Sequence, residues 1–139
     1  MASASIFLPA VAMAILTFVV VALTLRERVG QMRSGKIHPQ SISTSAQLAA
    51  KLSDSRCADN LRNLFELPVL FYLALVIAFV TAQAGPLFTL LAWLFVVLRI
   101  VHSAIHCGYN KVMHRFRVYL TSVLVLFAIW LRLAWGLLG

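Results

Sequence analysis

The chain of 139 residues has the length of a single domain. Hydrophobic residues make up 62% of it and charged residues only 12%, whereas about a quarter of a soluble domain is charged, so an ordinary soluble protein is excluded. The net charge of +8 does not indicate nucleic acid binding, because the basic residues lie in short segments between long apolar stretches, where anionic lipid headgroups are the nearer partner.

Four apolar stretches follow one another along the chain. They cover Ile6–Leu25, Leu64–Ala82, Leu87–Ile105 and Val118–Leu138. A transmembrane helix needs about 20 residues, and lipid tolerates no unpaired backbone groups, so each stretch predicts a helix. We expect an all-α integral membrane four-helix bundle in one domain, with helices over about 6–25, 54–82, 86–106 and 117–138. The first stretch lacks the basic segment and the cleavage site of a signal peptide, so it is expected to be retained.

Basic residues are concentrated in two of the three connections. Seven Lys and Arg residues lie between residues 26 and 62, three lie between residues 111 and 117, and the second connection has none. The positive-inside rule therefore predicts that both basic connections are cytoplasmic and that both termini lie outside. The cysteines, Cys57 and Cys107, lie near the predicted membrane edge on the basic side. We expect them to be reduced thiols or packing residues rather than a disulfide framework.

Two helical faces carry polar residues into the apolar stretches, where ionisable groups are costly and usually line a polar cavity or a bundle interior. Glu66 is the only carboxylate in the four stretches, and it shares the spacing of one helical face with Asp59 and Asn63. The third helix has a second such face, made of Arg99, His102, Ser103 and His106. Antiparallel packing of the two helices would bring Glu66 near Arg99.

Two interpretations of these faces are open. Glu66 and Arg99 would form an internal ion pair that fixes the packing of the helices, or the faces would line a cavity that binds a charged ligand. The number of polar groups favours the cavity. His102 and His106 have the spacing of two zinc ligands, but no third ligand lies at a suitable spacing, so we expect no metal.

The third connection combines cations with a phenol at the predicted membrane edge, from Tyr109 to Arg117. One interpretation is an anchor that sets the topology. The other adds that Arg115 or Arg117 stabilises an anion, such as a thiolate, held between helices, because a nearby guanidinium lowers the pKa of a thiol.

Two motifs resemble those of the MAPEG family (membrane-associated proteins in eicosanoid and glutathione metabolism). The stretch Asp59–Tyr72 resembles the second-helix motif, whose core is the Asn-x-x-Glu formed by Asn63 and Glu66. Arg99-x-x-His102, together with the segment 109–117, is similar to the third-helix region of bacterial members. The length, the four spans and the basic first connection agree with this resemblance, which covers essentially the whole chain.

The resemblance implies a homotrimer in the bacterial inner membrane, with glutathione as cosubstrate bound between neighbouring protomers. Family members conjugate glutathione to lipophilic electrophiles, reduce lipid hydroperoxides or isomerise a lipid endoperoxide. By position, Asn63 and Glu66 would hold the glutathione backbone and amino group, and Arg99 and His102 would line the same cavity.

The remaining site residues follow from the same resemblance. Arg115 or Arg117 would stabilise the thiolate, and Tyr109 lies nearby. Active mammalian members carry an arginine where this chain has Asp59, and Arg56 or Arg62 would take its place. The predicted function is a glutathione-dependent transferase or peroxidase for lipophilic electrophiles. The alternatives are a non-catalytic scaffold or regulator of the same fold and, less favoured, a transporter that uses Glu66.

Overall fold

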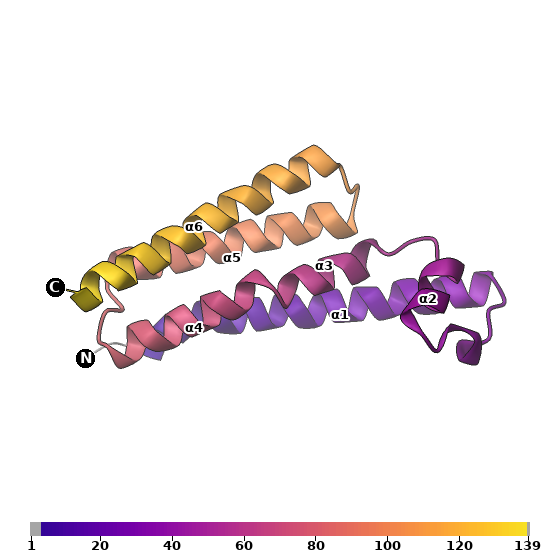
Figure 1. The fold of residues 1–139 in the computed structure, drawn as a ribbon, viewed down its shortest axis with the longest axis horizontal. Helices are drawn as coiled ribbons and strands as arrows, with labels where there is room; N and C mark the ends of the chain where they lie inside the picture. Colours follow the sequence, from indigo (N-terminus) through magenta and orange to yellow (C-terminus); the bar gives the residue numbers. More distant parts are fainter. Residues whose placement is uncertain (1–3, 139) are drawn as a thin grey trace.

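The computed structural model describes residues 4–138, which are helical apart from short turns and contain no strand. In chain order the elements are η1 (Ala4–Phe7), α1 (Leu8–Ser34), η2 (Pro39–Ile42), α2 (Ser45–Lys51), α3 (Arg56–Leu64), α4 (Leu67–Val80), α5 (Pro86–Cys107) and α6 (Val112–Leu138). Figure 1 shows the long helices side by side, with both ends of the chain at one end of the bundle and α2 at the other. We call the end near α2 and the α5–α6 turn the basic end.

Four helical segments are long and apolar enough to cross a membrane. They are Ala4–Ser34, Arg56–Val80, Pro86–Cys107 and Val112–Leu138. Large apolar side chains also cover the outside of the bundle, where Phe18 is 74% exposed and Phe127 is 59% exposed. Such a surface suits lipid rather than water. The prediction of an all-α integral membrane protein is confirmed.

α1 is longer than its apolar stretch. The expected helix over residues 6–25 instead runs from Leu8 to Ser34, so its last part projects beyond the apolar stretch. The segment after Leu25 is polar but contains good helix formers, and periodicity in apolar residues cannot detect it. The helix ends where the N–H of Gly35 bonds the carbonyl of Gln31 at 2.9 Å and Lys36 takes a left-handed φ of 51°.

The second membrane segment is broken. A single helix over residues 54–82 was predicted, whereas α3 ends at Leu64 and α4 begins at Leu67. Pro68 causes the break, because it lacks the N–H that would bond the carbonyl of Leu64 and its ring would collide with that carbonyl. Glu66 therefore lies in a turn and does not continue the helical face of α3.

The α5–α6 connection is shorter than predicted. α6 begins at Val112 rather than near residue 117, so Arg115 and Arg117 lie on a helix and not in a loop. The turn before it includes Asn110, which has a left-handed φ of 49°. The two arginines consequently project in different directions from the first turns of α6.

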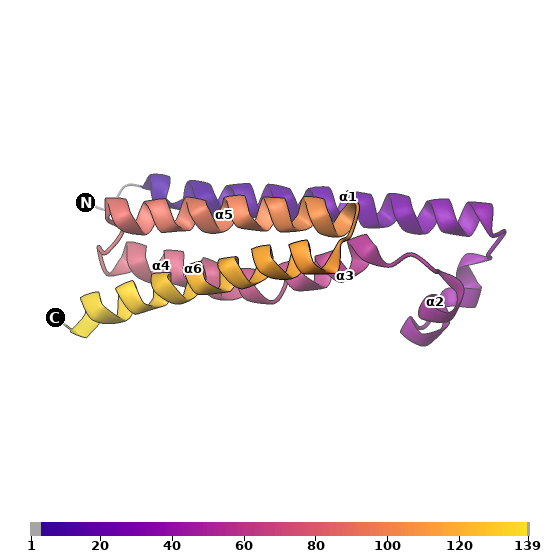
Figure 2. The same cartoon turned by 90° about the horizontal axis from the view of Figure 1, so that it is seen from above.

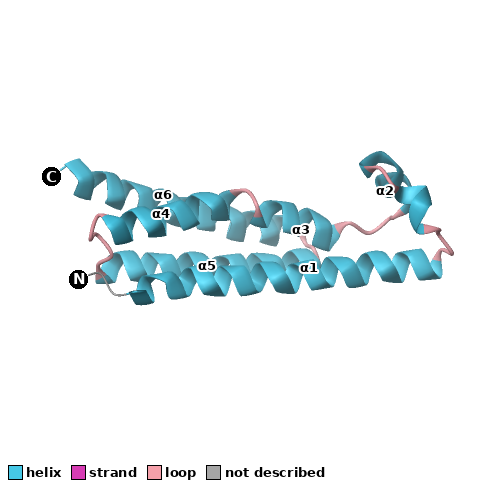
Figure 3. Ribbon diagram, turned by 90° about the horizontal axis from the view of Figure 1, so that it is seen from below, coloured by secondary structure: helices cyan, strands magenta, loops and turns pink. Residues whose placement is uncertain are grey.

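The core lies along the axis of the bundle, between all four membrane segments. Phe71 of α4 and Phe95 of α5 stack with ring centres 4.6 Å apart, and both are fully buried. Met13 of α1 and Ile129 of α6 complete this core. Figures 2 and 3 show the same four-segment arrangement from opposite sides. Apolar packing thus fills the middle of the bundle, and the buried polar residues gather toward its basic end.

Candidate functional site

The break between α3 and α4 leaves a backbone acceptor inside the bundle, and Arg99 satisfies it. Nη2 of Arg99 donates to the carbonyl of Asn63 at 2.9 Å. Nη1 lies 3.5 Å from Oγ of Ser122 on α6, and the guanidinium stands over the ring of Tyr119 at 5.4 Å. The Arg99 side chain is 0% exposed. A backbone group freed by a helix break in a membrane segment needs such a partner, so Arg99 joins α3, α5 and α6.

Glu66 and Arg99 do not form the internal ion pair that one interpretation required. Between residues 4 and 138 the ion pairs are those of Arg56 with Asp54 and of Arg62 with Asp59. Glu66 is exposed in its turn and attracts Arg99 only from a longer distance. The carbonyl of the broken helix holds Arg99 in place of a carboxylate.

Two buried histidines extend the polar cluster from Arg99 toward the basic end. Nδ1 of His102 lies 3.3 Å from the carbonyl oxygen of Arg115, and because a carbonyl only accepts, Nδ1 carries the proton. His106 meets the edge of the His102 ring, with ring centres 5.4 Å apart. Nε2 of His102, Nδ1 of His106 and Nε of Arg99 have no hydrogen-bond partner in the described chain. Buried polar atoms are normally paired, so this cluster retains the capacity to bind a polar group.

The predicted residues of the third connection separate into two groups. Arg115 is half-buried, its carbonyl contacts His102, and its Nη1 donates to Oδ1 of Asn110 at 2.8 Å. Arg117 is exposed, and no hydrogen bond or ion pair joins its side chain to another described residue. Tyr109 is 64% exposed, with its hydroxyl 3.1 Å from Nδ1 of His114. The fold therefore brings Arg115 to the cluster and leaves Arg117 and Tyr109 outside it.

A family model identifies the chain. The model described as the MAPEG family matches residues 6–135, nearly the whole length. This chain belongs to the MAPEG family. The resemblance seen in its second-helix and third-helix motifs is thereby confirmed, and the chain is a membrane protein of the family that works in glutathione and eicosanoid metabolism. No curated protein and no solved structure matches it.

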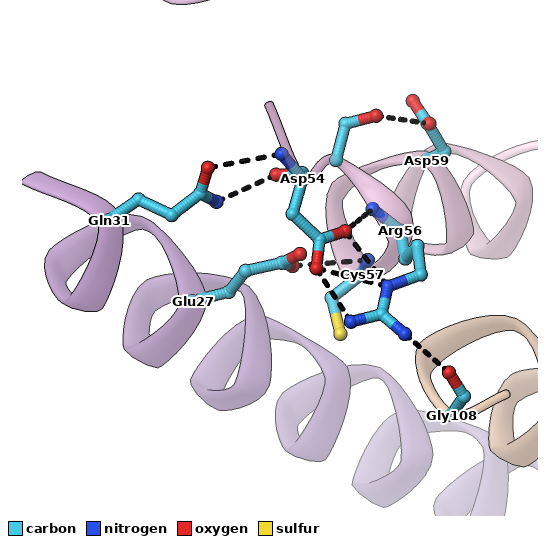
Figure 4. A network of polar contacts seen from close by, with 8 residues as sticks. Glu27, Gln31, Asp54, Arg56, Cys57, Asp59 and Gly108 are labelled. Atoms are coloured by element: carbon cyan, nitrogen blue, oxygen red, sulfur yellow. Dashed lines mark hydrogen bonds and ion pairs between the residues drawn. The ribbon is translucent and has the colours of Figure 1, made fainter. Parts of the chain in front are cut away.

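The other two predicted arginines of this MAPEG protein are engaged with carboxylates. Arg56 binds Asp54, with Nη2 at 2.6 Å from Oδ2, and its Nη1 donates to the carbonyl of Gly108 at 2.6 Å (Figure 4). The hydrogen bond from Arg56 holds the pKa of Asp54 well below its usual range. Arg62 is exposed and lies 3.7 Å from Asp59. Arg56 thus links the start of α3 to the α5–α6 turn.

Figure 4 shows how α1 joins the same region. The side-chain amide of Gln31 pairs with the backbone of Asp54 in both directions, at 2.8 Å and 3.0 Å. Oε2 of Glu27 accepts from the backbone N–H of Cys57 at 3.2 Å. These contacts use the part of α1 beyond its apolar stretch, which explains why that extension is ordered.

Sequence reasoning missed three members of the polar cluster. Asn60 is fully buried, and its Oδ1 accepts from Oγ of Ser103 at 3.4 Å. Ser122 and Tyr119 contact Arg99 from α6. Asn60 lies within the recognised motif, and Ser122 interrupts an apolar run, so both had a detectable signal. Nothing in the sequence pairs them with α5, because the contacts join residues far apart along the chain.

Proposed function

We propose that this MAPEG protein is a glutathione-dependent transferase or peroxidase that acts on lipophilic electrophiles. The observation that carries the proposal is the buried cluster of Arg99, His102 and His106, with Arg115 beside it. Three of its nitrogen atoms are unpartnered, and it lies beside the Asn-x-x-Glu motif of the family. The guanidinium donors of Arg99 and Arg115 suit glutathione, which carries two carboxylates and a thiol that reacts as an anion. The unprotonated Nε2 of His102 can accept a hydrogen bond from an amide N–H of the same ligand.

Each proposed role follows from the position of the side chain. Asn63 uses its backbone carbonyl to bind Arg99, so its side-chain amide stays available for the glutathione backbone. Glu66 is exposed at the helix break and can meet the amino group. Arg115 is the better of the two candidate arginines for the thiolate, because it is half-buried and held by Asn110, whereas Arg117 is exposed.

The assembly and the location are part of this proposal. Glu66 faces outward from the protomer, which fits a glutathione site shared with a neighbouring copy in a homotrimer. We place the basic connections in the cytoplasm of a bacterial cell and the bundle in its inner membrane, as the positive-inside rule predicts. Glutathione would enter from the basic end.

The proposed reaction needs no covalent enzyme intermediate. Arg115 stabilises the glutathione thiolate, and the desolvated surroundings strengthen that attraction. The thiolate then attacks an acceptor that arrives sideways from the bilayer. In a transfer its sulfur forms a bond to the electrophilic carbon, and the bond from that carbon to the leaving group breaks, so the leaving group departs with the electron pair. In a reduction its sulfur takes the distal oxygen of a hydroperoxide, the O–O bond breaks, and the alkoxide takes up a proton and leaves as the alcohol. A second glutathione attacks the sulfenic acid sulfur, which forms the disulfide and releases water.

Stopped-flow absorbance of thiolate formation tests the proposal on the full chain in detergent micelles. Mixing with millimolar glutathione is expected to give a thiolate signal in the wild type and in Arg117→Ala, and to give none in Arg115→Ala. Arg117 is the matched control, because it is an exposed arginine two residues away whose side chain projects in a different direction. Absence of glutathione binding in the wild type at millimolar concentration would overturn the proposal.

A second candidate function is a non-catalytic scaffold of the same fold. It is favoured by the internal bonds of Arg99 to Asn63 and Ser122, which stabilise the bundle without any ligand. The contacts of Asp59 also favour a scaffold. Asp59 pairs with Arg62 and accepts a hydrogen bond from Ser55 Oγ at 2.8 Å, so its carboxylate is used in contacts within the protein. The scaffold would be supported if the wild type binds no glutathione and if the Arg115→Ala variant has the same oligomeric state as the wild type.

A further inference from the structure

The two cysteines of the chain, 50 positions apart, meet at the basic end. Cys57 lies in the first turn of α3, Cys107 is the last residue of α5, and both thiols are free. Cys57 and Cys107 line the same cavity. Nδ2 of Asn60, one helical turn after Cys57, donates to Sγ of Cys107 at 3.6 Å. The packing of α3 on α5 therefore places the two cysteines next to each other.

Both thiols line a polar cavity of about 590 Å³ at the basic end. Its wall includes Arg26, Glu27 and Arg56, and Figure 4 shows the Cys57 thiol beside the Arg56 guanidinium. The cavity thus gives a polar reagent access to the thiol pair.

Cys107 also borders a second space, an apolar groove of about 370 Å³ between α1 and α5. Leu23, Ile100 and Ala104 are among the residues that line it. Because α1 and α5 are membrane segments, this groove faces the lipid-exposed side of the bundle. Cys107 is therefore the one residue of the thiol pair that lines both the apolar groove and the polar cavity.

We propose that Cys107 and Cys57 form a redox site that reduces lipophilic hydroperoxides and is converted to an intramolecular disulfide. The thiolate of Cys107 attacks the distal oxygen of the hydroperoxide, the O–O bond breaks, and the alkoxide takes up a proton to leave as the alcohol. Cys107 is then a sulfenic acid. Its sulfur is attacked by the Cys57 thiol, the S–S bond forms, the S–O bond breaks, and water leaves. The hydroperoxide gains the two electrons that the thiols lose.

The exposure of the two residues assigns these roles. Cys107 is half-buried and opens to both spaces, whereas Cys57 is 7% exposed. The more accessible thiol meets the oxidant, and the buried thiol beside it resolves the product before further oxidation. The thiol pair adjoins the polar cluster through Asn60, but its reaction requires no glutathione.

The test uses the full chain in detergent micelles with cumene hydroperoxide as the oxidant. Free thiols are counted, and peptides from a non-reducing digest are identified by mass spectrometry. We expect a disulfide between the peptides of Cys57 and Cys107, with both thiols restored by dithiothreitol. Cysteines that stay free, or that join two different chains, would overturn the proposal. Because dithiothreitol replaces glutathione, the result is independent of the function proposed above.

Three variants separate the roles. In Cys57→Ser we expect a sulfenic acid at Cys107 that dimedone traps. In Cys107→Ser we expect Cys57 to stay reduced, and its sulfenylation at the wild-type rate would contradict the assignment. Ala104→Phe should slow oxidation by cumene hydroperoxide but not by hydrogen peroxide, because it fills only the apolar groove. If Ala104→Phe is oxidised by cumene hydroperoxide as fast as the wild type is, the hydroperoxide does not enter through the apolar groove.

Discussion

Replacing Arg99 with lysine tests whether the guanidinium stabilises the broken second segment. Lysine keeps the positive charge, so the cost of burying a charge is retained, but the planar fork of donors is replaced by a single ammonium. The contact at stake is the 2.9 Å bond from Nη2 to the Asn63 carbonyl, since the 3.5 Å contact with Ser122 is long for a hydrogen bond. A hydrogen bond from a charged donor contributes about 1.5–3 kcal/mol, and we expect the free energy of unfolding to fall by that amount.

The measurement is reversible unfolding in mixed micelles with an increasing fraction of sodium dodecyl sulfate, followed by circular dichroism at helical wavelengths. Arg132→Lys is the matched control, because Arg132 is exposed on α6 and an exposed substitution changes stability by about 0.5 kcal/mol or less. Equal stability of Arg99→Lys and Arg132→Lys would refute the stabilising role of the guanidinium.

Arg99 and Pro68 should contribute to stability in a coupled way. In Pro68→Ala the helix can continue, and the N–H of Leu67 can then bond the carbonyl of Asn63. Arg99 would lose its acceptor, so Arg99→Lys should cost less in this background than in the wild type. A double-mutant cycle is expected to give a coupling of about 0.5–3 kcal/mol. A coupling of zero would show that the break and the arginine are unrelated.

Three further predictions use the same unfolding assay. Because the hydrogen bond from Arg56 lowers the pKa of Asp54, their contact stabilises the fold above the ordinary carboxyl pKa of about 3.9 and is lost as the pH falls toward the lower folded value. Asp54→Asn should therefore flatten the pH dependence of stability below that pH, and an unchanged slope would contradict this. Gly30→Ala should raise stability by about 0.5–1 kcal/mol, because Gly30 is inside α1 and no atom lies within 4 Å of an added Cβ. Gly108→Ala should lower stability, since its Cβ would lie 2.6 Å from the carbonyl oxygen of Ala104. Equal effects of Gly30→Ala and Gly108→Ala on stability would contradict the different surroundings of the two glycines.

The membrane segments could be predicted from the sequence because hydropathy is a local property. About 20 consecutive apolar residues specify a spanning helix whatever the rest of the chain does. The extension of α1 to Ser34 was missed for the same reason, since polar residues give no such signal. Pro68 interrupts the helix between Asn63 and Glu66, so the prediction of one continuous helix, which put both residues on one face, is wrong.

The composition of the cluster could be predicted in part. The helical spacing on α5 placed Arg99, His102 and His106 together, and all three are buried and close to one another. Their partners could not be predicted, because they lie on α3 and α6 and meet α5 only after the bundle has formed. That Arg115 is half-buried while Arg117 is exposed likewise depends on where α6 begins. Helix boundaries are weakly specified by local sequence.

Length, hydropathy and charge by themselves determined that this chain is a four-span membrane protein with a basic end, and two short motifs indicated its family. These properties add up along the chain and need no contact between distant residues. The tertiary structure alone decided that Arg99 binds a backbone carbonyl instead of Glu66, and that Cys57 meets Cys107. Both depend on residues tens of positions apart, brought together by the helix break at Pro68 and by the packing of α3 against α5.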